Sequence, residues 1–198
     1  MNTPQVSTAQ AGEPVTCDAA ILYCDLRGIA DFWPLASEIE VILFINRYFT
    51  DIREIIDAHH GVINQFFDDT VLAIFGLEQG GCPVVQAMQA GLAIIAHSAG
   101  LDVTNAAPSA ISIGIDFSTV QVGTLLGTDA VSYQYLIIGD SADNAKSLQA
   151  LSRHLGHHII LSTEAYKRLP DDLGRQFISL GMHELSDGKA PATLYGKG

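Results

Sequence analysis

Positive charge, cysteine and long apolar runs are all scarce in this chain of 198 residues. It carries 10 lysines and arginines against 22 aspartates and glutamates, so its formal net charge is -12 and nonspecific binding to nucleic acid or anionic lipid is not expected. The three cysteines (Cys17, Cys24 and Cys82) give no disulfide framework, which suits a reducing compartment. No apolar run reaches the ~18 residues of a membrane span, and the first residues do not resemble a signal peptide. We therefore expect a cytoplasmic location and no membrane insertion.

The remaining composition is that of a folded domain. Hydrophobic residues make up 48% of the chain and charged residues 16%, which excludes a disordered protein. The length suits one domain with its own core. We expect a flexible tail over residues 1–15 and a single domain over residues 16–198.

Apolar periodicity predicts alternating strands and helices. The segment 17–26 reads as a buried strand, and Ser37 as the cap of a long amphipathic helix that ends at His59-His60-Gly61. Two apolar runs, 62–67 and 70–75, flank Asp68-Asp69 as in a β-hairpin. Further helices are expected over residues 83–99, 139–152 and from 163, and further strands over 110–117, 119–126, 158–161, 176–180 and 193–195. The order predicts an α/β (α+β) sandwich with helices on a largely antiparallel sheet.

Two carboxylates are the sharpest candidates for chemistry. Asp25 ends the first strand and Asp69 lies at the hairpin tip. If the two strands are neighbours, these side chains converge, and paired carboxylates suit Mg²⁺ or Mn²⁺ beside a phosphate. The alternative is that both are solvated turn residues. His154, His157 and His158 offer a second possible ligand cluster, although Gly156 interrupts them where a helix turns into a strand.

Several motifs, in order along the chain, resemble the class III adenylate and guanylate cyclases. They are Tyr23-Cys24-Asp25-Leu26-Arg27-Gly28-Ile29, Asn46-Arg47-Tyr48-Phe49, the hairpin from His60 to Gly76, Ile113-Gly114-Ile115, Val122-Gly123, Ile137-Ile138-Gly139-Asp140, Ile160-Leu161-Ser162 and the segment from Leu185 to Tyr195. The resemblance covers residues 17–196 and implies that family's sandwich fold, with a ferredoxin-like βαββαβ core.

The resemblance also implies a site. Asp25, Leu26 and Asp69 match the positions that hold two Mg²⁺ or Mn²⁺ ions. The loop Leu26, Arg27, Gly28, Ile29 and Ala30 matches the one whose backbone N–H groups bind the triphosphate, which needs no side-chain charge.

Other positions depart from the family pattern. Gln65 and Leu136 stand where the family reads the base, and the usual lysine and aspartate are absent. Asp143 and Ser147 stand where the family has a ribose-orienting asparagine and a transition-state arginine. A slip of one residue would offer Asn144 instead, but it turns the helix by ~100°. Losing a transition-state donor costs ~10²–10³ in rate.

Three functions remain open from the sequence. The first is an active cyclase that converts a nucleoside triphosphate to a 3′,5′-cyclic nucleotide and pyrophosphate, with an altered base pocket that favours a substrate other than ATP, such as a pyrimidine nucleotide. The second is a metal-carrying half-site that needs a complementary cyclase domain. The third is a catalytically degenerate domain with a regulatory or dimerisation role. The family implies a head-to-tail homodimer or heterodimer in which two subunits share each site.

Overall fold

The computed structural model describes residues 14–25, 37–67, 70–78, 80–99, 111–126, 133–185 and 190–197. The expected tail therefore lies outside the described residues up to position 13, and Val15 already belongs to the first strand. The helices and strands are β1 (Val15–Asp25), α2 (Glu38–Ala58), β2 (Gly61–Phe67), β3 (Thr70–Phe75), α3 (Pro83–Ala99), β4 (Ser112–Leu126), β5 (Tyr133–Ile138), α4 (Ser141–Leu155), β6 (Ile159–Leu161), α5 (Thr163–Tyr166), α6 (Asp171–Gly174), β7 (Ile178–His183) and β8 (Ala192–Lys197).

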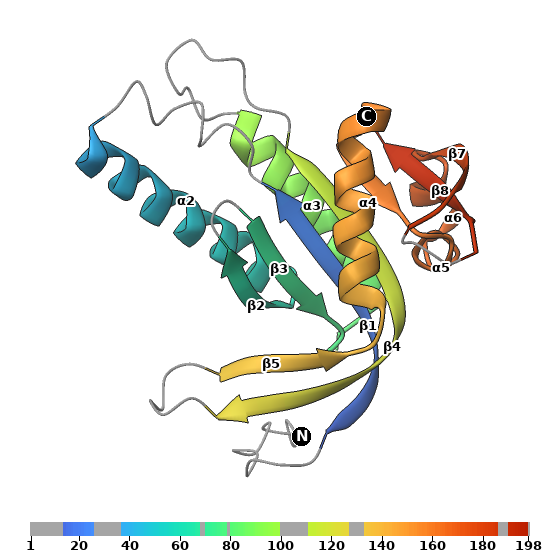
Figure 1. Cartoon of the computed structure of the whole chain (residues 1–198), viewed down its shortest axis with the longest axis horizontal. Helices are drawn as coiled ribbons and strands as arrows, with labels where there is room; N and C mark the ends of the chain where they lie inside the picture. The colour runs from blue at the N-terminus through green and yellow to red at the C-terminus, as the bar shows by residue number, and fades with distance from the viewer. Residues whose placement is uncertain are drawn as a thin grey trace.

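Among these residues the strands form one eight-stranded sheet in the order β2-β3-β1-β4-β6-β8-β7, with β5 paired to β4 beyond that path. Only the β4–β6 pair is parallel within the described sheet. The expected α/β fold with a largely antiparallel sheet is confirmed. Figure 1 shows α4 crossing one face of β1 and β4, with α2 and α3 on the other face.

Strand β1 lies inside the sheet, between β3 and β4, and separates two apolar clusters. Because side chains alternate along a strand, Leu22 and Cys24 pack toward α2 and α3, whereas Ile21 and Tyr23 belong to a cluster that contains Ala145 of α4. Cys24 is fully buried. Burial and the neighbouring charge of Asp25 raise the pKa of the Cys24 thiol.

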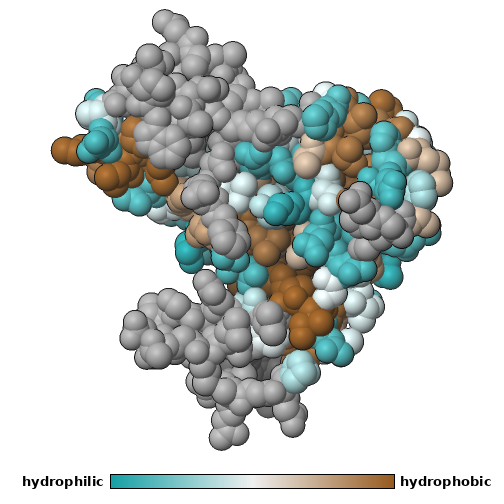
Figure 2. Space-filling model, in the orientation of Figure 1, coloured by the Kyte–Doolittle hydropathy of each residue, from teal (hydrophilic) through white to brown (hydrophobic). Residues whose placement is uncertain are grey.

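The long helix α2 begins as the sequence predicts. Ser37 and Glu40 form a reciprocal capping box, in which the Ser37 backbone N–H donates to Glu40 Oε2 at 2.8 Å and the Glu40 N–H donates to Ser37 Oγ at 3.4 Å. Three apolar side chains near this end, Ile39, Ile42 and Leu43, are exposed, and Figure 2 shows hydrophobic surface there.

The expectation of two strands over 110–117 and 119–126 is wrong. A single strand, β4, runs through Ser118 and Thr119, where the two expected strands would have met. Both residues pair with β1, and Thr119 Oγ1 donates to Asp18 Oδ1 at 2.6 Å across the two strands. The partner hairpin strand is β5, which the sequence analysis did not identify.

Candidate active site

Asp25 lies at the end of β1, where three elements meet. The register pairs it with Thr70 of β3 on one side and with Ser112 of β4 on the other. Its side chain is only 5% exposed and lies on the α4 face of the sheet, opposite to Cys24. A carboxylate this buried needs partners within the protein or a cation.

Gln149 of α4 supplies one such partner. Its Nε2 donates to Asp25 Oδ2 at 2.9 Å and to Ser112 Oγ at 2.8 Å, and Gln149 is 6% exposed. Neither Gln149 nor Ser112 was predicted from the sequence. The available signal was a polar residue on the buried face of α4, beside Ala145, Leu148 and Ser152.

The second predicted carboxylate, Asp69, lies outside the described residues, as do Asp68 and the whole loop from Leu26 to Ala30. The strand pairing on either side of Asp68 and Asp69 indicates where this hairpin tip begins and ends. Strand β2 ends at Phe67 and pairs there with Thr70, the first residue of β3. Thr70 is also the partner of Asp25, so Asp69 is the chain neighbour of the residue opposite Asp25. The convergence of the two carboxylates stays a prediction that this register supports.

The two predicted base-pocket positions come from strands that meet. Gln65 follows an irregularity in β2, pairs with Leu72 and is partly buried. Leu136 pairs with Gly123 in the β4–β5 ribbon, and its side chain lies outside the description. The backbone N–H of Tyr135 donates to Asn64 Oδ1 at 3.0 Å.

This bond joins the chain neighbours of Gln65 and Leu136, so both positions belong to one edge of the molecule. Asn64 is a residue that the sequence analysis missed. Its partner is 71 positions away and gives no local signal.

The ribose and transition-state positions lie on α4. Asp143 is exposed, and the Ser147 hydroxyl donates to the Asp143 carbonyl at 2.9 Å within the same helix. Asn144 turns inward, where its Nδ2 and the Ser141 hydroxyl donate to the buried Asp116 Oδ2 at 3.0 and 2.9 Å. Asn144 therefore does not stand in for the family's asparagine.

The histidine cluster is not assembled as a ligand set. His158 Nδ1 lies 3.1 Å from the Ile111 carbonyl. The described part of the chain brings together no group of three or more His, Cys, Asp or Glu side chains that could hold a metal ion. A site built from Asp25, Leu26 and Asp69 would use two such side chains, and oxygen donors are the ligands that Mg²⁺ and Mn²⁺ prefer. The residues present thus fit these ions.

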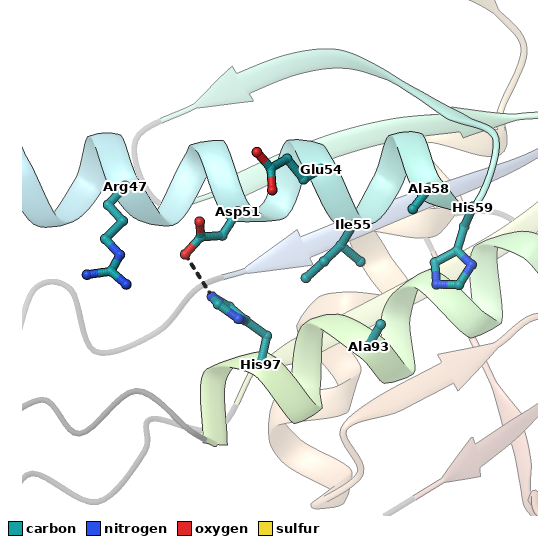
Figure 3. A pocket seen from close by; sticks show the side chains of 8 residues that line it. All are labelled: Arg47, Asp51, Glu54, Ile55, Ala58, His59, Ala93 and His97. Atoms are coloured by element: carbon teal, nitrogen blue, oxygen red, sulfur yellow. Dashed lines mark ion pairs between the residues drawn. The ribbon is translucent and has the colours of Figure 1, made fainter.

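A separate groove lies between α2 and α3, on the face of the sheet opposite to α4 (Figure 3). It encloses about 450 Å³, and the His97 Nε2 and Asp51 Oδ2 atoms pair across it at 3.1 Å. None of the predicted site residues lines it; its lining residues are Arg47, Asp51, Glu54, Ile55, Ala58, His59, Ala93 and His97.

In the described residues, no helix has both the length and the apolarity to cross a membrane.

Sheet order, a buried aspartate at the end of β1 and the acidic hairpin together define a nucleotide cyclase-type catalytic fold. A family model described as the adenylate and guanylate cyclase catalytic domain matches residues 13–196, so the chain belongs to this family.

The relatives agree. An adenylate cyclase of Anabaena cylindrica is 25% identical over 168 residues, covering 83% of this chain and 33% of the cyanobacterial protein. An uncharacterized protein of Mycobacterium tuberculosis is also 25% identical, over 166 residues, and covers 83% of this chain and 29% of its own length. The chain thus spans about a third of the curated relatives that it matches.

Solved structures share the fold. A bacterial light-regulated adenylyl cyclase superposes with a TM-score of 0.76 at 25% identity, covering 94% of this chain and 53% of that one. The adenylyl cyclase CyaB from P. aeruginosa gives a TM-score of 0.75 at 21% identity, covering 93% and 95%.

Proposed function

We propose that this domain is a metal-dependent nucleotide cyclase with an altered base pocket. The observation that carries the proposal is Asp25. It is a carboxylate almost fully removed from water at the end of β1, and the Gln149 amide donates a hydrogen bond to it. Carboxylate oxygens are ligands that divalent ions such as Mg²⁺ and Mn²⁺ prefer. The register pairs Asp25 with Thr70, the chain neighbour of Asp69.

In the proposed reaction, the ribose O3′ bonds to the α-phosphorus of a nucleoside triphosphate. The bond from that phosphorus to the bridging oxygen breaks, pyrophosphate leaves, and the O3′ proton passes to solvent. Asp25, Leu26 and Asp69 would hold two Mg²⁺ or Mn²⁺ ions, which supply activation of O3′ and neutralise charge on pyrophosphate. The backbone N–H groups of residues 26–30 would bind the phosphates.

The base pocket favours a substrate other than ATP. Gln65 can donate and accept a hydrogen bond, whereas Leu136 can do neither, so the pair lacks the charges of a lysine and an aspartate. The Asn64–Tyr135 bond holds the two strands together at this pocket without contributing charge. A pyrimidine nucleotide is our candidate substrate class.

Two other candidate functions are a metal-carrying half-site in a heterodimer and a regulatory domain without activity. The observation that favours both is Ser147, whose hydroxyl is already bonded to its own helix and supplies no positive charge to a phosphate. In a shared site, the missing arginine and asparagine would come from another cyclase domain. A head-to-tail dimer is expected in either case, and the exposed apolar side chains at the start of α2 favour self-association.

Turnover of all four nucleoside triphosphates by the pure protein, with Mn²⁺ or Mg²⁺, tests the proposal. We expect a cyclic product that disappears in excess chelator and falls at least about 100-fold in Asp25→Asn and in Asp69→Asn. Asp18→Asn is the matched control, because Asp18 is an exposed carboxylate on the same strand. Activity that survives in both site variants would place the chemistry elsewhere.

Gain-of-function variants separate the candidates. Gln65→Lys with Leu136→Asp should shift activity toward ATP, and Ser147→Arg should raise the rate by ~10² or more whichever base is used. A product formed only after addition of a complementary cyclase domain would favour the half-site function. No product under any of these conditions would favour the regulatory one. Sedimentation that shows only monomer at high concentration would contradict the homodimer.

A further inference from the structure

One polar contact to Asp25 comes from the buried face of α4. Gln149 is 124 positions from Asp25 in the chain, yet its amide bridges the carboxylate of β1 and the hydroxyl of β4. An ionised carboxylate has no proton to give, so the amide nitrogen and not its oxygen must face Asp25. Both amide hydrogens then have defined acceptors, Asp25 Oδ2 at 2.9 Å and Ser112 Oγ at 2.8 Å.

We propose that Gln149 is a positioning residue for the Asp25 carboxylate, and that it orients this group for a divalent cation. The proposal rests on the proposed function, since it assumes that Asp25 binds the ion. An amide with two anchors has little freedom to rotate, so its bond fixes the carboxylate plane. Partners of this kind behind a metal ligand typically contribute about 10–100-fold to metal affinity.

The neutrality of Gln149 matters as much as its reach. A lysine or arginine here would also bond Asp25, but it would cancel the charge that attracts the ion. An amide can orient the carboxylate without adding a positive charge beside it. Because Gln149 and Ser112 are both nearly buried, water does not compete well for these hydrogen bonds.

The same bonds could simply fasten α4 to the sheet. A second amide–carboxylate pair on α4 allows the two roles to be separated. Asn144 Nδ2 donates to Asp116 Oδ2 at 3.0 Å, which joins α4 to β4 where the Gln149–Asp25 pair joins α4 to β1, and the Asp116 carboxylate is likewise buried. Asp116 pairs with Ile21, four residues before Asp25 along β1, so it belongs to the interior of the sheet and not to its metal-site edge.

The experiment measures Mn²⁺ binding to the full chain, by the loss of the free-ion signal in electron paramagnetic resonance, without nucleotide. Gln149→Met keeps the length of the side chain and removes the donor, and Asn144→Leu is the matched control. We expect both variants to lower the melting temperature. Only Gln149→Met should weaken Mn²⁺ binding, by about 10–100-fold.

Wild type and Asp25→Asn are measured in parallel. If wild type binds Mn²⁺ no better than Asp25→Asn, the metal site and this proposal both fail. If wild type binds and Asp25→Asn does not, while Gln149→Met stays within about twofold of wild type or falls only as far as Asn144→Leu, the positioning role alone is overturned. Should Gln149→Met not fold, Ser112→Ala removes one anchor of the amide. It should then weaken Mn²⁺ binding by less than tenfold but measurably, and unchanged binding would count against the proposal.

Discussion

Gly114 sets the distance between α4 and the sheet, and replacing it with alanine should separate them. A Cβ at this position would lie 2.0 Å from the Ala145 carbonyl oxygen and 2.5 Å from the Gln149 backbone nitrogen. These are backbone atoms of α4, so no rotamer change relieves the contact. Reaching even a tight separation of 3.0 Å requires the helix and strand to part by about 1 Å.

Overpacking of a core costs ~1–3 kcal/mol, and we expect the upper end because backbone must move. For a chain of this length, ~3 kcal/mol lowers the melting temperature by about 6–12 °C. The same displacement stretches the Gln149–Asp25 bond beyond hydrogen-bonding distance, so Mn²⁺ binding should weaken along with stability.

Thermal unfolding followed by circular dichroism measures this effect. Gly123→Ala is the matched control, since Gly123 lies on the same strand and a Cβ there would meet no atom of the described residues within 4 Å. We expect it to melt within about 2 °C of wild type. A Gly114→Ala protein that melts as the control does would refute the argument that α4 packs directly on this glycine.

Two further predictions concern groups whose pKa is shifted. The hydrogen bonds from Ser37 lower the pKa of Glu40, so the stability that they provide is present above the unfolded pKa of Glu40 and is lost as pH falls through the folded pKa. In Ser37→Ala, carbon-13 NMR should find the Glu40 pKa raised, and the stability difference from wild type should shrink at low pH. An unchanged Glu40 titration would contradict the capping box. Burial raises the pKa of Cys24 and also that of Cys17, while Cys82 is partly exposed. A thiol reagent should therefore modify native protein first at Cys82 and reach Cys24 only on unfolding. Mass spectrometry that finds Cys24 modified in folded protein would be evidence against its place in the core.

The sequence predicted those features whose signal is local. Helix α2 has a capping residue and a regular apolar stripe, and the β2–β3 hairpin has two apolar runs around two acidic residues, so their bounds agree closely with the structure. Strand β4 did not follow its local signal. Ser118 and Thr119 resemble turn residues, but pairing with β1 on the exposed face keeps them extended.

The candidate site was predictable only in part for the same reason. Asp25 was identified because it ends an apolar strand and matches a family motif. The hydrogen bond from its partner Gln149 forms because α4 packs closely against β4 at Gly114, a tertiary contact that has no local sequence signal. The link between Asn64 and Tyr135 likewise joins strands that are far apart in the chain.

The place of β1 between β3 and β4 has a consequence for synthesis. Both of its sheet neighbours are made later, because β3 is complete only at Phe75 and the paired part of β4 only at Val122. At 5–20 residues per second, the apolar strand that ends at Asp25 would wait roughly 3–10 s for its first partner and about 5–20 s for its second. Its run from Ala19 to Cys24 is otherwise an exposed aggregation-prone segment during that interval. The nascent chain should therefore depend on a chaperone, or on early packing against α2, until β3 arrives.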